Sequence, residues 1–530
     1  MMIGELHPTT CRKRGLIRAF LGDRRANTAM MFAIVLLPLL IVAGAAIDFA
    51  RQSAMKSKAQ AALDAAILQA ALQPENTSNK DLTTGARTYF DTEMAKDVII
   101  VDQFAVTRSG DVFTATMKGQ TDSTLLGLIG IPSLGFSASS EVRMSERKFE
   151  VALALDTTGS MEGDKLNRLK TASAQLVDRL ATATTASDGV KFAVVPFAST
   201  VRVGSDKESE QWMDDAGKSK RSADNLLPGL NRFALLDHLN RPWTGCVEAR
   251  LPPYDVTDEP ATNSDPDTLF VPLFIPDDPD SKWNYPNTYV NDVATWGGTL
   301  AKIGNTKKYG IASAADASFP NKWSSVSTQK PYYFYSNSIN ISGPNALCES
   351  KQLLPLTTDT VKVKKTIDSL IAAGPTNTTE GVMWAWRALS HEPPFTEGAQ
   401  KNNRNVDKII VLLSDGNNWV LGRPTDDRGS EYTAYGFVGN GNLPGAKAGD
   451  SEEDIWAAMD ARTALACENA KLDGITIYTI RLELDDDRSA DLLRNCASKP
   501  EYYLDVPDSA QLDAAFSKIS NDILQLYLSK

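Results

Sequence analysis

Histidine is scarce in this sequence of 530 residues, which contains only His7, His238 and His391. None of them neighbours Ser160, so a Ser-His-acid triad built on that serine would lack its base. The chain also has no Gly-x-Ser-x-Gly elbow and no Walker loop. The absence of a Cys-x-x-Cys pair, together with the few histidines, argues against a zinc site. We therefore expect that the protein is not an enzyme.

An excess of basic residues is missing as well. The chain has 55 Lys and Arg against 66 Asp and Glu, a formal net charge of −11, which argues against nucleic acid as the main partner. The exception is the segment 1–25, where six basic residues face only Glu5 and Asp23. These basic residues are Arg12, Lys13, Arg14, Arg18, Arg24 and Arg25.

A long uncharged run follows this basic leader directly. Residues 26–47 carry no charge, and Asp48 ends the run. A helix of this length spans about 33 Å, enough for a hydrocarbon core of about 30 Å. The positive-inside rule then places the leader in the cytoplasm and the rest of the chain outside. A cleaved signal peptide is the alternative, because Ala43-Gly44-Ala45 resembles a cleavage site, but the run exceeds the 7–15 apolar residues usual there.

Cysteine usage agrees with this topology. Cys11 precedes the span, whereas the other four cysteines follow it, in what would be an oxidising compartment. Four cysteines allow three connectivities. We expect Cys246–Cys348 and Cys467–Cys496, because each pair stays within one structural unit; four buried free thiols are the alternative.

A cluster of oxygen-bearing side chains follows the apolar run 151–155. Asp156, Thr158 and Ser160 are spaced by two, so in an extended loop they point to the same side. Open α/β sheets bind ligands at this carboxyl end of a strand. One carboxylate and two hydroxyls are hard donors that suit Mg²⁺, with Mn²⁺ or Ca²⁺ as alternatives. The simpler interpretation is that these residues only cap the next helix.

Two later segments complete the pattern. Thr376 lies in a loop before a helix, and Asp415 follows the apolar run 409–413. With Asp156-x-Thr158-x-Ser160, this order resembles the metal-ion-dependent adhesion site of the von Willebrand factor A family. The resemblance implies that the hydroxyls of the first motif bind the metal directly and that both aspartates act largely through water. It also implies that an acidic side chain of a protein partner takes the open position.

Buried-strand patterns alternate with helical ones after residue 149, which predicts an α/β fold with a doubly wound, mainly parallel sheet. The sequence predicts a cytoplasmic leader (1–25), a transmembrane helix (26–50), a small α+β stalk (51–148) and a von Willebrand factor A domain (149–530). An insertion rich in Pro, Asp and aromatic residues interrupts the last domain at 203–353. Its aromatic residues form either a binding surface or the core of the insertion.

The combined layout is similar to that of TadG-like proteins of the bacterial tight-adherence (Flp) pilus apparatus. The motifs that carry this resemblance are residues 24–33, 353–359 and 381–395. It implies a single-pass protein of the inner membrane, with a periplasmic carboxy-terminal domain that binds partners in pilus assembly. A surface or secreted adhesin for host or matrix ligands is the alternative, and a metal-dependent enzyme is a third, which the few histidines disfavour.

Overall fold

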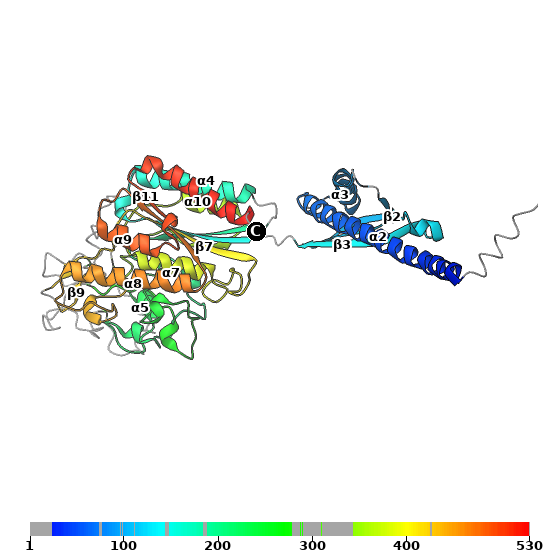
Figure 1. Ribbon diagram of the computed structural model, residues 1–530. Coiled ribbons are helices and arrows are strands. Elements are labelled where there is room, and N and C mark those ends of the chain that lie inside the picture. The colour runs from blue at the N-terminus through cyan, green and yellow to red at the C-terminus, as the bar shows by residue number, and fades with distance from the viewer. Residues whose placement is uncertain are drawn as a thin grey trace, which may run out of the picture. The chain divides into compact units, whose positions relative to one another are not determined.

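The computed structural model describes residues 24–73, 77–95, 97, 99–110, 112–143, 148–183, 188–277, 287, 289, 309, 343–424 and 427–528. The chain divides into two compact units, Met1–Glu146 and Arg147–Lys530 (Figure 1). Residues 1–23 of the basic leader, among them Cys11, lie outside the described residues, as does the segment 330–335.

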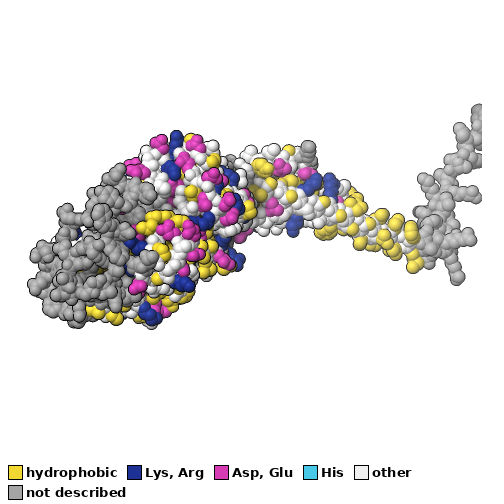
Figure 2. Space-filling model, turned by 90° about the vertical axis from the view of Figure 1, so that its left-hand side faces the viewer, with side chains coloured by type: hydrophobic (Ala, Val, Ile, Leu, Met, Phe, Trp, Pro, Cys, Tyr) yellow, Lys and Arg dark blue, Asp and Glu magenta, His cyan; other side chains and the backbone are white. Residues whose placement is uncertain are grey.

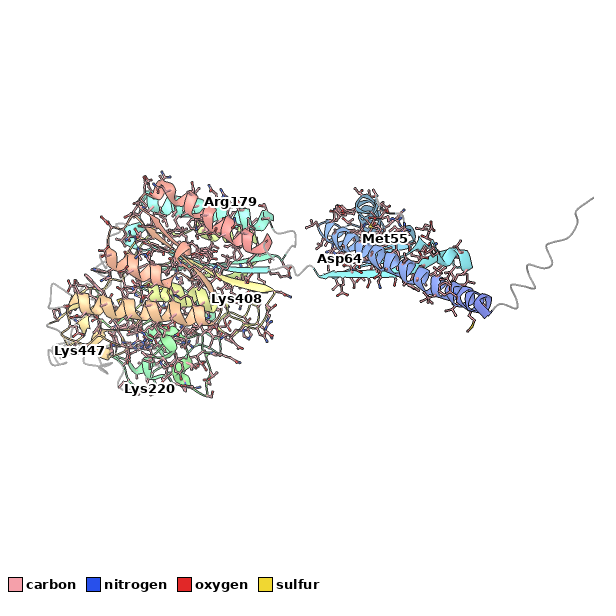
Figure 3. All side chains as sticks on the ribbon, viewed as in Figure 1. Met55, Asp64, Arg179, Lys220, Lys408 and Lys447 are labelled. Carbon is pink, nitrogen blue, oxygen red and sulfur yellow. A yellow bond between two sulfur atoms is a disulfide. The ribbon has the colours of Figure 1, made fainter. Side chains whose placement is uncertain are left out.

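The first unit combines two helices with a three-stranded antiparallel sheet of order β1-β2-β3. Its elements are α2 (Arg24–Ala71), α3 (Asn79–Glu93), β1 (Ile100–Ser109), β2 (Val112–Asp122), the short 3-10 helix η1 (Leu126–Ile129) and β3 (Ser133–Arg143). Leu63 and Ile67 of α2 and Phe90 of α3 are buried with Phe113 and Met117 of the sheet. Figure 3 marks Met55 and Asp64 on this carboxy-terminal half of α2.

The amino-terminal half of α2 has a different character. It continues through Pro38 without a break in the helix, and its large apolar side chains are exposed. Figure 2 shows hydrophobic side chains covering this end of the helix. Ile34–Ala71 is long and apolar enough to cross a membrane. The helix therefore fits a membrane anchor that extends directly into the first unit.

The second unit is built on a six-stranded sheet of order β11-β10-β7-β4-β5-β6. All neighbouring strands are parallel except β6, which pairs antiparallel with β5 at one edge. The strands are β4 (Lys148–Asp156), β5 (Val190–Phe197), β6 (Leu354–Thr357), β7 (Val406–Ser414), β10 (Thr476–Leu482) and β11 (Tyr503–Val506). The continuous apolar runs in β4 and β7 explain why these strands are buried on both sides.

Helices cover both faces of this sheet (Figure 1). One face carries α4 (Asp164–Ala183), α6 (Thr360–Asp368) and α10 (Leu512–Leu528), and the other carries α7 (Thr378–Leu389), α8 (Glu452–Leu472) and α9 (Asp487–Cys496). Alternate residues of β4 pack into the two cores: Val151 and Leu153 on one side, Ala152 and Ala154 on the other. The sheet is therefore mainly parallel with a helical layer on each side.

Two disulfides join parts of the second unit that are distant in sequence. Cys246 and Cys348 are bonded with a Cα–Cα distance of 5.6 Å, and Cys467 and Cys496 with one of 5.1 Å. Both predicted pairings are confirmed. The described aromatic residues of the insertion are mostly core, since Tyr289 and Tyr309 are buried in the larger hydrophobic cluster.

Candidate functional site

Two neighbouring strands bring the predicted metal residues to one edge of the sheet. Asp156 is the last residue of β4, and Ser414, immediately before Asp415, is the last residue of β7. β4 and β7 pair in parallel, and the chain continues from β4 to β5 on its other side. The strand order therefore reverses between β4 and β7, and Asp156 lies at the carboxyl ends of these two strands. Open sheets bind their ligands at such a switch point.

A chain of hydrogen bonds joins four oxygen-bearing side chains at this edge. Thr158 donates to Asp156 Oδ1 through its backbone N–H at 2.9 Å and its hydroxyl at 2.6 Å. The hydroxyls of Thr158 and Ser160 are 3.0 Å apart. Ser160 in turn donates to Asp415 Oδ1 at 2.6 Å. Asp156, Thr158 and Asp415 are buried, whereas Ser160 is exposed, so the cluster reaches the surface at Ser160.

Thr376, the fifth predicted residue, lies at the same place. A Cβ on Gly416 would be 2.7 Å from Thr376 Oγ1 and 3.7 Å from Ser160 Oγ, so the loop requires glycine at this position. The backbone N–H of Gly159 donates to Gly374 O at 2.9 Å, which ties the first motif to the loop of Thr376. The structure therefore brings all five residues together.

Two further side chains of the cluster were missed by the sequence analysis. Ser414 donates to Asp156 Oδ2 at 2.6 Å. Lys165, in the first turns of α4, donates to Asp415 Oδ2 at 2.7 Å and lies 3.9 Å from Glu483. The position of Ser414 just before Asp415 could have suggested its role. Nothing in the sequence signals that Lys165 turns back toward the strand ends.

The donor set fits a small hard cation. Burial and, after it, the charge of Asp415 raise the pKa of Asp156, so the ionised carboxylate is costly at this position without a cation. The residues Asp156, Thr158, Ser160, Thr376 and Asp415 supply only oxygen atoms, as Mg²⁺ prefers. Among the described residues, no group of three or more His, Cys, Asp or Glu side chains could hold a metal ion. A cation at this edge would therefore depend on hydroxyl oxygens beside the two carboxylates.

A buried carboxyl lies beside the loop that carries Thr376. Glu349 is buried, its Oε2 atom has no hydrogen-bond partner, and a Cβ on Gly374 would be 2.1 Å from that oxygen. Gly374 also has a φ of +83°, so both its backbone and its surroundings require glycine. Burial raises the pKa of Glu349 to about 8.

This buried carboxyl predicts a pH-dependent stability. The folded state holds the proton of Glu349 up to about pH 8, whereas an unfolded glutamate releases it near pH 4.5. The folded state thus binds more protons between these values, and the free energy of unfolding should fall as pH rises through this window. Glu349→Gln should remove this loss and stabilise the protein at pH 8 by a few kcal/mol, since each tenfold change in proton affinity is worth about 1.4 kcal/mol.

Urea unfolding at pH 5 and pH 8, followed by tryptophan fluorescence, measures this effect. All nine tryptophans belong to the second unit, so the signal reports that unit alone. Glu392→Gln, at a glutamate with 44% of its side chain exposed, is the matched control and should change little. Equal stability of Glu349→Gln and the wild type at pH 8 would contradict the prediction.

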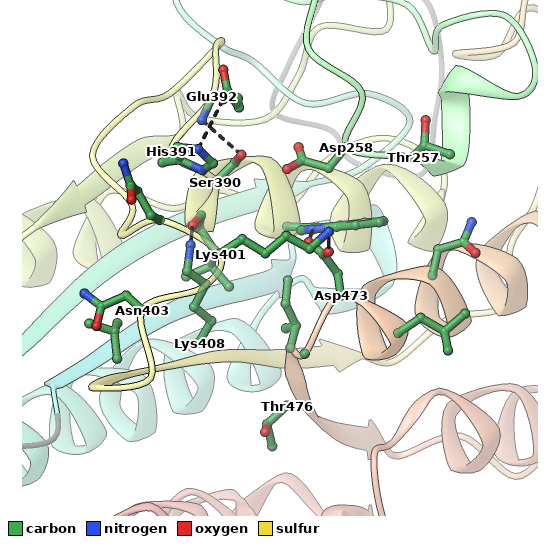
Figure 4. Close-up of a pocket in the computed structure, with 18 of the residues that line it drawn as sticks. Thr257, Asp258, Ser390, His391, Glu392, Lys401, Asn403, Lys408, Asp473 and Thr476 are labelled. Carbon is green, nitrogen blue, oxygen red and sulfur yellow. Dashed lines mark hydrogen bonds and ion pairs between the residues drawn. The ribbon is translucent and has the colours of Figure 1, made fainter.

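A separate cleft of about 600 Å³ lies at the opposite end of the strands, beside Val406 and Thr476 (Figure 4). The basic side chains that line it all have acidic or backbone partners. Lys401 is ion-paired with Asp473, and His391 lies 3.1 Å from Glu392. Lys408 donates to the backbone oxygens of Leu389 and Ala399. The five oxygen-bearing residues, and not this cleft, form the candidate site.

Comparison with known families identifies the amino-terminal segment. Residues 26–73 match the family described as putative Flp pilus-assembly TadE/G-like. The resemblance to this group is thus confirmed over residues 26–73, most of which belong to α2. No curated protein matches the sequence significantly.

Solved structures with some similarity include proteins of bacterial pili and of the mussel byssus. The vWF domain of the type V pili tip protein Mfa5 from Porphyromonas gingivalis is 12% identical with a TM-score of 0.33, covering 71% of this chain and 95% of its own. The PilB minor pilin from Streptococcus sanguinis is also 12% identical, with a TM-score of 0.31 and coverages of 81% and 78%. Proximal thread matrix protein 1 from the mussel byssus, solved with a zinc-occupied MIDAS motif, is 11% identical with a TM-score of 0.28 and coverages of 71% and 47%. TM-scores of this size do not establish a common fold.

Proposed function

We propose that this protein is a non-enzymatic, envelope-anchored component of Flp pilus assembly that binds protein partners through a metal-ion-dependent adhesion site. The observation that carries the proposal is the convergence of Asp156, Thr158, Ser160, Thr376 and Asp415 at the switch point of the sheet. The parallel strand order and the helical layers on both faces support a von Willebrand factor A type of domain.

The same residues define how partner binding would work. Thr158 and Ser160 would hold Mg²⁺, or Mn²⁺ or Ca²⁺, through their hydroxyls, while Asp156 and Asp415 orient bound water and supply the negative charge. When bound, the cation would act as a Lewis acid that a carboxylate of the partner can coordinate. Ser160 is the exposed member of the set, so a partner would approach from its side. Because the hydroxyls that would bind the cation directly are neutral, the cation would keep its positive charge and attract an acidic side chain of the partner.

The first unit supports the envelope setting. Its apolar helix fits a membrane anchor, and the two disulfides of the second unit fit an oxidising compartment. We propose that the leader is cytoplasmic, that 26–50 cross the inner membrane, and that both the stalk (51–148) and the domain at 149–530 are periplasmic. In this location the protein would meet the proteins of the pilus machinery, which we propose as its partners.

Fractionation of cells tests this assignment. Wild-type protein should stay in the inner membrane after carbonate washing, and cells carrying Asp156→Asn should lose Flp pili while keeping the protein at wild-type level. Exposure of the protein on the cell surface, with unchanged piliation in the variant, would favour an adhesin over an assembly component.

A further inference from the structure

An apolar loop beside the membrane helix remains outside the proposed function. It connects β2 to β3 and contains η1, and the segment 123–140 carries no charge. Leu126 is buried, but four other large side chains of the loop are exposed: Leu125 by 40%, Leu128 by 82%, Ile129 by 48% and Ile131 by 44%. In the sheet of the first unit most large apolar residues, such as Phe113 and Met117, are instead buried in a common core. The exposed apolar side chains of the loop therefore need a different surrounding.

Specific contacts hold the loop at the outer end of the apolar half of α2. A Cβ on Gly44 would be 2.8 Å from Leu125 Cβ, so the loop packs directly against the helix backbone at this glycine. The carboxylate of Asp48 accepts the backbone N–H groups of Thr124, Leu125 and Leu126 at 3.1, 2.8 and 2.8 Å. One turn further on, Arg51 donates to Thr124 Oγ1 at 3.2 Å.

Asp48 is the first charged residue after the uncharged run, but it is only 4% exposed. The loop covers this charge, and the neighbouring helix residues Ile47 and Phe49 are exposed by 60% and 54%. Gly44 and Asp48 are four residues apart, about 6 Å along the helix axis. The apolar surface of α2 and that of the loop therefore meet at the same level of the helix.

Most backbone N–H groups of the loop also have hydrogen-bond acceptors within the protein, as a surrounding without water requires. Besides the three N–H groups bound by Asp48, four more have acceptors within the loop: Ser123 on Pro132 O, Leu128 on Leu125 O, Gly130 on Gly127 O and Ile131 on Leu126 O. These bonds measure 2.9 to 3.2 Å. Backbone at membrane depth must satisfy its polar groups internally, whereas a solvated loop has no such need.

We propose that this loop inserts into the outer leaflet of the bilayer, at its interface with water, next to the end of the span. The proposal rests on the assignment of α2 as the membrane anchor. Because the loop continues the apolar surface of that helix, lipid is the partner that covers the exposed side chains of the loop. Inserted there, Leu128 and Ile129 would lie among acyl chains while Arg51 stays at the headgroup level. The loop would fix the depth and rotation of α2 and couple the first unit to the membrane surface.

Fluorescence quenching by brominated lipids tests the insertion. A polarity-sensitive dye is placed on Leu128→Cys in the full-length chain in nanodiscs, with Cys11 replaced by serine because the other four cysteines form disulfides. Val42→Cys, exposed by 69% on the apolar half of α2, is the reference for acyl-chain depth. Leu72→Cys, exposed by 77% beyond the end of α2, is the matched reference outside the membrane.

The dye at Leu128 should be blue-shifted and quenched several-fold, as at Val42, whereas the dye at Leu72 should be unaffected. Quenching at Val42 without quenching at Leu128 would overturn the loop insertion and leave the anchor intact. A blue shift at Leu128 without quenching would show that protein covers the loop, which also overturns it. Absence of quenching at Val42 would refute the membrane anchor itself, and the loop insertion with it.

Discussion

Replacing Asp156 with asparagine should abolish the binding of Mg²⁺ and Mn²⁺ to the protein. Asp156 is fully buried at the end of β4, and its two oxygens organise Thr158 and Ser414. The substitution keeps the size of the side chain and removes one of only two negative charges in the five-residue set. Because burial and the charge of Asp415 raise the pKa of Asp156, the ionised carboxylate is costly without a cation. The metal-free variant should therefore fold at least as well as the wild type.

Titration calorimetry with purified protein measures this loss. Asp178→Asn, on α4 with 57% of its side chain exposed, is the matched control and should bind as the wild type does. Lys165→Met should bind at least as tightly as the wild type, since it removes the ammonium that is paired with Asp415 at 2.7 Å. An unchanged affinity of Asp156→Asn would refute the site.

Replacing Glu248 with alanine should destabilise the second unit by about 3–5 kcal/mol, the usual cost of removing one partner of a buried ion pair. Glu248 lies 2.9 Å from Arg221 Nε and 2.7 Å from Arg232 Nη1, with all three side chains at most 1% exposed. It also accepts the hydroxyl of Tyr432 at 2.5 Å. The substitution leaves two guanidinium groups buried with too little negative charge around them.

Urea unfolding followed by tryptophan fluorescence measures this effect in the full-length chain. Glu210→Ala is the matched control, because Glu210 forms an exposed pair with Lys207 at 3.4 Å and should contribute less than about 1 kcal/mol. A loss below about 1 kcal/mol for Glu248→Ala would show that the network is not important for stability. Tyr432 lies between Asp415 and α8, and Glu248 lies in the insertion at 203–353. The network therefore joins two segments that lie outside the regular alternation of strands and helices.

Local patterns determined much of this structure, and the exceptions have physical reasons. The apolar runs before Asp156 and Asp415 predicted β4 and β7, because a strand buried on both faces leaves a continuous signature. β6 was missed, since it has only four residues, lies at the edge of the sheet and contains Pro355, which is atypical of a strand. Lys165 contacts Asp415, and Glu349 lies beside Gly374. Both are contacts between segments that are distant in the sequence, and the spacing of residues does not predict them. The covering of Asp48 by the loop at 123–132 is likewise a contact between segments more than 70 residues apart.

Partner capture in Mg²⁺ and in chelator tests the central claim most directly. Full-length wild-type protein, solubilised with its native partners, should retain specific envelope proteins in Mg²⁺ and release them in EDTA, and Asp156→Asn should retain none in either condition. Asp178→Asn should behave as the wild type. Recovery of the same proteins by wild type in EDTA and by Asp156→Asn would contradict a metal-dependent adhesion site at Asp156, Thr158, Ser160, Thr376 and Asp415.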